Sequence, residues 1–109
     1  MKMTDISELD LLELFEVEPA RDGYLLTYKV GSTGGVELLF LYNPIEQYIQ
    51  TTLKHRGNEV MTTSCDTISR LWIDGNVLGA EFSYKGGQVQ LELTVRPKLH
   101  VKWIGLRTA

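Results

Sequence analysis

The sequence predicts a mainly β protein, an antiparallel meander that forms a β-sandwich or a partly open barrel, with one short N-terminal helix. From Asp22 onward, turn signals recur, most of them separated by about 8–12 residues, the spacing of a β-meander. The runs between them are rich in Val, Ile, Thr, Tyr and Leu, and the later runs alternate between apolar and polar residues. A length of 109 residues suits a single domain, residues 1–109.

A short helix is predicted first, within residues 4–15. The hydroxyl of Thr4 or Ser7 can accept a hydrogen bond from a free backbone N–H of the first turn. Acidic residues follow, where the helix dipole favours negative charge, and Pro19 ends any helix before it. A competing interpretation is a strand over residues 11–17, where apolar and polar residues alternate poorly.

The predicted strands lie between turn signals. Residues 36–42 are almost all apolar, so we expect this strand in the middle of a sheet, with the helix covering its second face. Residues 77–84, 88–96 and 99–104 alternate, which is typical of a sheet with one face in water. The turn signals are Arg21-Asp22-Gly23, Gly31-Ser32-Thr33-Gly34-Gly35, Asn43-Pro44, Arg56-Gly57-Asn58, Asp74-Gly75-Asn76, Lys85-Gly86-Gly87 and Arg96-Pro97-Lys98.

Two carboxylates, Glu81 and Glu92, fall on the polar faces of neighbouring predicted strands. Two acids that lie close together can perform acid–base chemistry. The same face also offers cations, and opposite charges that face each other across a sheet attract. We expect each carboxylate to face one of Arg70, Arg96 and Lys102.

Composition excludes several classes of protein. No apolar run approaches the roughly 18–20 residues that span a membrane, and the first ten residues lack a secretory apolar segment. The single cysteine forbids an internal disulfide and favours a reducing cytoplasm. A net charge of -3 argues against nucleic acid as a partner.

The charge is unevenly distributed along the chain. Residues 1–22 hold seven acidic and two basic residues, a net charge of -5, whereas residues 23–109 are mildly basic at +2. Such asymmetry affects which partners a protein attracts and how fast it meets them.

No motif for catalysis, a cofactor or a metal ion stands out. Cys65, His55 and His100 lack metal-ligand spacing, and no loop matches a phosphate-binding pattern. Residues 31–35 are rich in glycine but precede a strand, so we interpret them as a mobile hairpin loop. A triad of Cys65, His55 and Asp66 can be drawn, but a dispensable or mildly core Cys65 is the better interpretation. We therefore expect no enzyme, no cofactor and no metal site.

Aromatic and acidic residues supply a candidate partner-binding site. Trp72 alternates out of phase with its apolar neighbours, and an exposed tryptophan is a favoured interface anchor. Tyr42, Tyr48 and Trp103 are candidates of the same kind. Two alternatives are open: a helix or second sheet covers Trp72, or Trp72 and nearby basic residues form an RNA-binding face. The predicted partner-binding residues are Glu8, Asp10, Glu13, Glu16 and Trp72.

The overall pattern of the chain carries a resemblance to a known family. A leading helix, Ile6-Ser-Glu-Leu-Asp-Leu-Leu-Glu-Leu-Phe15, is followed by a punctuated meander without catalytic motifs. In this the chain resembles the immunity proteins of bacterial contact-dependent growth inhibition and related polymorphic toxin systems. The stretches Leu38-Leu-Phe-Leu-Tyr-Asn-Pro-Ile-Glu-Gln-Tyr-Ile-Gln50 and Arg56-Gly-Asn-Glu-Val60 also resemble small bacterial β proteins.

The resemblance implies a cytoplasmic inhibitor that binds one cognate toxin domain, often a nuclease. An acidic inhibitor suits such a partner, because nucleases are commonly basic to bind phosphates. We expect no nucleic acid and no membrane among the partners of this chain. The alternative function is a small-ligand-binding or enzymatic β-barrel domain, which needs an apolar cavity of roughly 300 Å³ or more between its sheets.

Overall fold

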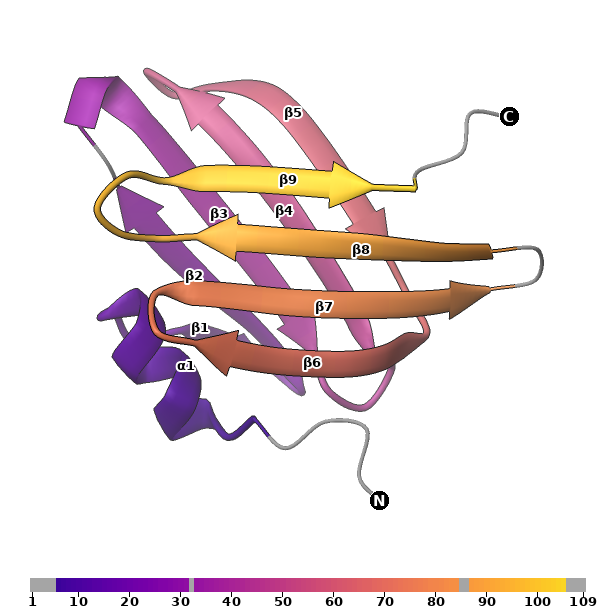
Figure 1. Ribbon diagram of the computed structural model, residues 1–109. Coiled ribbons are helices and arrows are strands. Elements are labelled where there is room, and N and C mark those ends of the chain that lie inside the picture. Colours follow the sequence, from indigo (N-terminus) through magenta and orange to yellow (C-terminus); the bar gives the residue numbers. More distant parts are fainter. Residues whose placement is uncertain (1–5, 32, 85–86, 106–109) are drawn as a thin grey trace. The chain divides into compact units, whose positions relative to one another are not determined.

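The described part of the chain forms two antiparallel sheets and one α-helix (Figure 1). The computed structural model describes residues 6–31, 33–84 and 87–105. Neither sheet closes into a barrel, and the prediction of a mainly β fold with a short N-terminal helix is confirmed. The chain divides into two compact units, residues 15–66 and residues 1–14 with 67–109, so the single domain stays a prediction.

Residues 15–66 form a five-stranded sheet whose strands follow one another in chain order, as Figure 1 shows. The predicted apolar strand takes the central position, as expected. A 3-10 turn, Thr33–Gly35, precedes it, and Ser32 of the glycine-rich loop lies outside the described residues. The strands are β1 (Ala20–Asp22), β2 (Leu25–Gly31), β3 (Val36–Asn43), β4 (Tyr48–His55) and β5 (Asn58–Cys65).

The aromatic core of this unit lies on one face of β2 and β3. The ring of Phe15 lies 4.9 Å from that of Tyr28 and 5.0 Å from that of Phe40, measured between centroids. Tyr42 is also buried on this face, so its expected place outside the main core is wrong. Its neighbours across the strands, such as Leu26, are apolar, and burial raises the pKa of its hydroxyl.

The second face of β3 differs from the expectation. Leu39 and Leu41 are only half-buried, and Phe15, the last residue of the helix, packs on the opposite face with Phe40. The helix up to Leu14 and β3 belong to different units, so the expected cover of the second face by the helix stays a prediction. The strands on either side present polar side chains there, because Lys29 and Thr52 are the register partners of Leu39.

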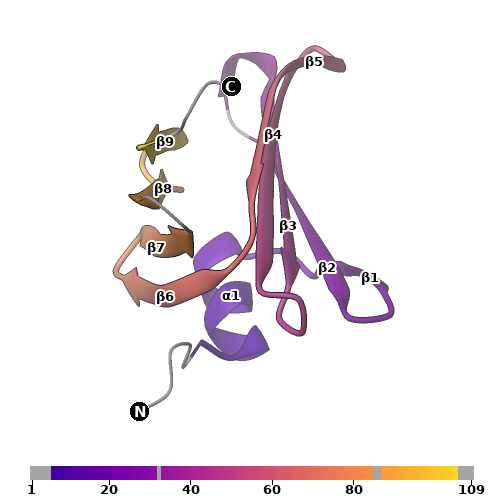
Figure 2. The same cartoon turned by 90° about the vertical axis from the view of Figure 1, so that its right-hand side faces the viewer.

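The second unit contains a four-stranded sheet, again in chain order (Figure 2). Its inner face is apolar, and Leu78, Ala80 and Phe82 are fully buried there. Trp103, expected outside the core, stacks on Phe82 with ring centroids 5.5 Å apart, so that expectation is wrong. The strands are β6 (Ile68–Asp74), β7 (Val77–Tyr84), β8 (Gly87–Thr94) and β9 (His100–Ile104).

Tight turns form where the sequence places them. Arg56 and Gly57 connect β4 to β5 with φ values of 52° and 83°, and Gly75 opens the turn after β6 with φ 62°. A left-handed backbone at these positions costs glycine nothing, which explains the Gly in both turns. The turn signal at residues 85–87 lies partly outside the described residues.

The helix α1 (Glu8–Phe15) lies within the predicted segment and begins after a capping box. The backbone N–H of Asp10 donates to Ser7 Oγ at 3.2 Å, and the N–H of Ser7 donates to Asp10 Oδ2 at 2.9 Å. Ser7 is thus the N-cap, whereas Thr4 lies outside the described residues. The competing strand over residues 11–17 is wrong.

A single arginine connects the end of α1 to the strands of its unit. Arg96 donates through Nη1 to the carbonyl of Leu14 at 2.8 Å and through Nη2 to Asn76 Oδ1 at 3.1 Å. A cation at the last carbonyls of a helix is favourable, because those carbonyls lack partners within the helix. Arg96 therefore belongs to the helix end, and its expected place as a partner of Glu81 or Glu92 is wrong.

Removing the N-cap tests this account of the helix. We expect Ser7→Ala to lower the free energy of unfolding by about 1 kcal/mol, because the N–H of Asp10 loses its acceptor. Urea denaturation measures the change. Ser64→Ala, an exposed serine on β5, is the matched control and should change little. Equal effects of the two substitutions would contradict a capping role for Ser7.

Candidate functional site

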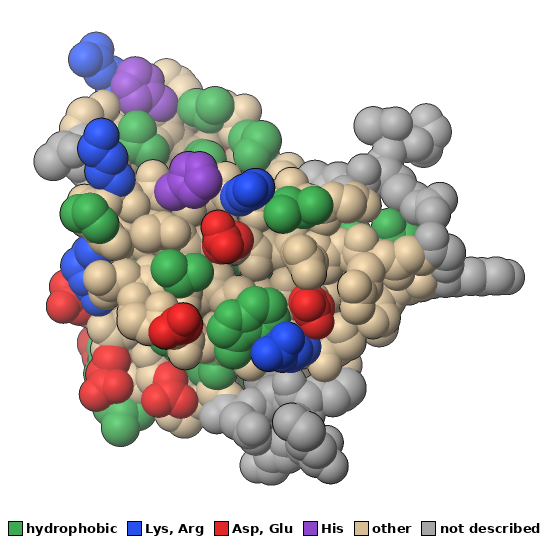
Figure 3. Space-filling view, viewed as in Figure 1, with side chains coloured by type: hydrophobic (Ala, Val, Ile, Leu, Met, Phe, Trp, Pro, Cys, Tyr) green, Lys and Arg blue, Asp and Glu red, His purple; other side chains and the backbone are tan. Residues whose placement is uncertain are grey.

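The outer face of the β6–β9 sheet carries polar and aromatic side chains in a regular grid. Register places Trp72 beside Gly79 and Gly79 beside Glu92, and in the next row Glu81 lies beside Gln90. Figure 3 shows hydrophobic, acidic and basic side chains interspersed on this face. The strict alternation of β7 and β8 is what directs these residues outward, since their neighbours in the chain are buried.

Trp72 lies against a glycine. A Cβ atom built on Gly79 would lie 2.2 Å from two carbons of the Trp72 indole, so no other residue fits there without moving the ring. The guanidinium carbon of Arg70 lies 4.5 Å from the ring centroid, a cation–π contact. Trp72 lies outside the apolar core, as its alternation with the apolar residues beside it in the strand predicts. It is half-buried on this outer face.

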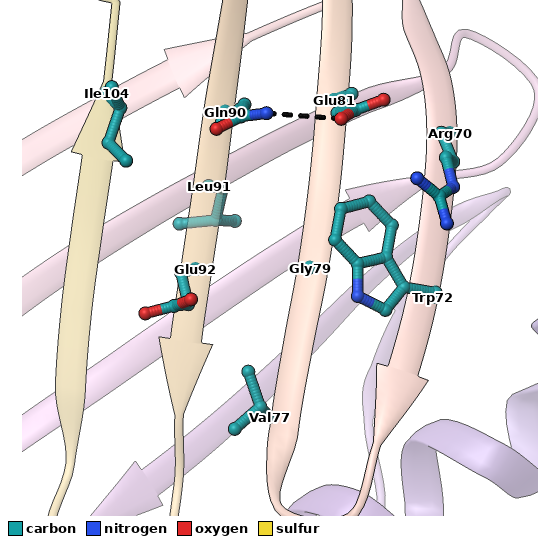
Figure 4. A pocket seen from close by; sticks show the side chains of 9 residues that line it. All are labelled: Arg70, Trp72, Val77, Gly79, Glu81, Gln90, Leu91, Glu92 and Ile104. Atoms are coloured by element: carbon teal, nitrogen blue, oxygen red, sulfur yellow. Dashed lines mark hydrogen bonds between the residues drawn. The ribbon is translucent and has the colours of Figure 1, made fainter.

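A shallow pocket of about 150 Å³ opens beside this tryptophan (Figure 4). Gln90 Nε2 donates to Glu81 Oε2 at 3.1 Å across the pocket wall. Apart from the second N–H of the Gln90 amide, the remaining polar groups of Glu81, Gln90 and Glu92 are acceptors. The lining residues are Arg70, Trp72, Val77, Gly79, Glu81, Gln90, Leu91, Glu92 and Ile104.

The residues of the expected ion pairs lie opposite each other across neighbouring strands, but the side chains of Glu81 and Arg70 contact other groups. Arg70 is the partner of Glu81 across the strands, and Lys102 is the partner of Glu92, as predicted. In side-chain contacts, however, Glu81 accepts from Gln90, and the Arg70 guanidinium lies over Trp72. Arg70 therefore contributes to the aromatic contact at the rim of the pocket.

The predicted acidic residues divide into two kinds. Glu8 and Glu13 lie exposed on α1, and Glu16 lies exposed just after it with φ 60°. Asp10 is half-buried and holds the N–H of Ser7. Asp10 thus has a structural role that its place among partner-binding residues did not anticipate, while the exposed three are accessible to a partner.

The triad drawn from Cys65, His55 and Asp66 does not assemble. Cys65 pairs with Ile49 at one end of the β4–β5 hairpin, and His55 pairs with Asn58 at the other. Ile49 and His55 are six residues apart along β4, a separation of roughly 20 Å at 3.3 Å per residue. Burial, and then the charge of Asp66, raise the pKa of the Cys65 thiol, which disfavours the reactive thiolate.

Across residues 6–31, 33–84 and 87–105 no group of three or more His, Cys, Asp or Glu could hold a metal ion. In the same ranges no helix has the length and apolar character needed to cross a membrane.

The centre of the pocket was not predicted. Gly79 lies within the predicted strand 77–84 but was given no role, and Gln90 and Ile104 were not singled out. A signal was present, because a glycine inside an alternating strand often marks a close approach by another group. The tryptophan that approaches it lies on the neighbouring strand in the predicted hairpin.

Filling Gly79 tests the tryptophan contact. In a Trp103→Phe background, which leaves Trp72 as the sole fluorophore of its type, we expect Gly79→Ala to push the indole into solvent. The emission maximum should shift to the red, and acrylamide should quench it more strongly. Gly31→Ala is the matched control, since a Cβ there meets nothing within 4 Å. Unchanged emission in Gly79→Ala would contradict the contact.

This chain is similar in fold to a protein of known structure. No family model matches the sequence, and no curated protein matches it. Among solved structures, the chain matches a chain of the contact-dependent growth inhibition toxin–immunity protein complex from Klebsiella pneumoniae 342, with a TM-score of 0.80 and 27% identity. The match covers 94% of this chain and 97% of that chain, so it concerns the whole fold. The resemblance drawn from the sequence is thereby confirmed: this chain is similar to a protein of a contact-dependent growth inhibition toxin–immunity complex.

Proposed function

We propose that this chain is a cytoplasmic immunity protein that binds and neutralises a cognate toxin domain. The observation that carries the proposal is the near full-length match to a chain of a toxin–immunity protein complex. We further propose that the toxin is basic and a nuclease, and that inhibition is by binding without catalysis. An acidic inhibitor is suited to such a partner, since nucleases carry positive charge for phosphate.

The exposed acids of the N-terminal segment support this partner. Seven of the chain's fourteen acidic residues fall within residues 1–22. Glu8, Glu13 and Glu16 among them are exposed, and clustered surface charge accelerates the encounter with a partner of opposite charge. We propose that these acids guide the toxin to the immunity protein, with Trp72 as an anchor of the contact.

The pocket favours this proposal over a ligand-binding or enzymatic domain. Small-molecule sites usually have volumes of about 300–1,000 Å³ and enclose most of their ligand. The pocket beside Trp72 measures about 150 Å³ and lies on the outer face of one sheet. A surface hollow of this size suits one side chain of a protein partner better than a whole substrate.

Co-expression tests the proposed function. The candidate toxin domain is the C-terminal region of a large protein encoded directly upstream, expressed in a bacterial host from an inducible promoter. We expect it to arrest growth alone and growth to recover when this chain is co-expressed. Failure to protect would contradict the proposal, as would arrest caused by this chain alone, which would make it the toxin.

Charge reversal in the N-terminal segment tests how the toxin is found. We expect Glu8→Lys/Glu13→Lys/Glu16→Lys to slow association with a basic toxin and to flatten the salt dependence of the rate, with a smaller change in dissociation. Surface plasmon resonance at several salt concentrations measures both rates.

The control must separate local charge from net charge. Glu46→Lys/Glu59→Lys/Asp74→Lys reverses three exposed acids elsewhere and changes the net charge by the same amount. If both triple variants slow association equally, only net charge matters. If neither does, the N-terminal acids merely solvate α1 and play no part in recognition.

A further inference from the structure

The pocket on the β6–β9 sheet is an acceptor-rich site in a basic part of the chain. Residues 67–109 contain six basic residues but only three acidic ones. Two of those three, Glu81 and Glu92, line the pocket. Negative charge in this segment is thus concentrated at one place on its outer face, where an indole wall adjoins it.

Hydrogen-bond capacity defines what the pocket can hold. One of the two N–H donors of the Gln90 amide is engaged by Glu81, so the pocket offers one further N–H donor and, as acceptors, the amide oxygen and both carboxylates. Because Gly79 has no side chain, the Trp72 indole lies against its backbone and forms one wall of the pocket, and Glu92 flanks Gly79 on the other neighbouring strand. An occupant should therefore bring several donors, a positive charge and a flat surface that can lie along an indole.

We propose that this pocket receives the guanidinium of one arginine of the cognate toxin. Guanidinium is planar, carries five N–H donors and stacks on aromatic rings, whereas an ammonium group is a compact point charge. Charge complementarity with Glu81 and Glu92 and the wall of Trp72 favour this occupant. The inference rests on the proposed immunity function and specifies the surface and the chemistry of the contact.

Two cations lie near the carboxylates: Arg70 in the lining of the pocket and Lys102 across the strands from Glu92. Arg70 is engaged at the Trp72 ring, whereas Lys102 is the register partner of Glu92, close enough that its charge would oppose an incoming cation at that carboxylate. Neutralising Glu92 and neutralising Lys102 should therefore have opposite effects on the binding of a guanidinium. A role for Glu92 in folding alone would not produce that reversal of sign.

The first experiment uses small probes and does not need the toxin. N-acetyl-L-argininamide is titrated into the labelled chain while the indole N–H signal of Trp72 is followed by NMR, with assignment from Trp103→Phe. Its citrulline counterpart, equal in shape but neutral, is the probe control. We expect the signal to shift with the arginine probe only. The shift should be lost in Glu92→Gln, larger in Lys102→Gln and unchanged in Glu46→Gln, an exposed acid in another turn.

The second experiment uses the toxin domain. We expect Glu92→Gln to raise the dissociation rate of the complex at least about tenfold, because it removes one partner of a desolvated charge pair. Glu46→Gln should leave that rate as it is in the wild type. A shift by the arginine probe together with faster dissociation supports the proposal.

Other outcomes overturn it in distinguishable ways. No probe shift, or an equal shift with the citrulline probe, removes arginine as the occupant. A specific shift without any change in toxin dissociation leaves the immunity function standing and places the toxin elsewhere. A wild-type chain that does not bind the toxin refutes the proposed function itself. Self-association that Glu92→Gln abolishes, measured by sedimentation, would assign the pocket to a second copy of the chain.

Discussion

Burial of the inner face of the β6–β9 sheet determines what its outer face can do. Successive side chains of a strand point to opposite faces, so the residues that must be buried decide where all the others lie. Leu78, Ala80 and Phe82 are fully buried on β7, and a register slip of one residue would bring all three into solvent. The contact between Trp72 and Gly79 exists because this register is fixed. The candidate surface therefore needs no strong interactions among its own polar residues to stay in place.

The strands of this sheet are predictable because alternation is a local property of the sequence. Val89, Leu91 and Leu93 occupy every second position of β8, and burial confirms that they share a face. The helix start is equally local. Ser7 and Asp10 stand three residues apart, and that spacing alone assigns the carboxylate to the helix N-terminus. The capping role of Asp10 can therefore be predicted from the sequence.

Contacts between residues far apart in the chain could not be predicted in the same way. The Arg96 guanidinium donates to the carbonyl of Leu14, which is 82 positions away in the sequence. No feature of the sequence near either residue predicts this hydrogen bond. The faces of β3 pose the same problem, because its run is apolar on both. Whether Leu39 or Phe40 is the more buried depends on the neighbouring strands and on Phe15. Periodicity gives the two faces of a strand but not what covers each one.

The two groups of acids differ in the physics by which they can act on a partner. Glu8 and Glu13 are exposed on α1, where salt screens their field beyond about 8–10 Å. Charges of this kind alter how often partners meet and tolerate changes in position. Glu81 and Glu92 line a pocket with an aromatic wall, where a bound partner would exclude water and the interaction would depend on geometry. Discrimination between related toxins requires a difference in affinity between them. Under the proposed function, the pocket suits this role better than the acidic helix does, since a misplaced donor in the pocket would leave a carboxylate desolvated and unpaired.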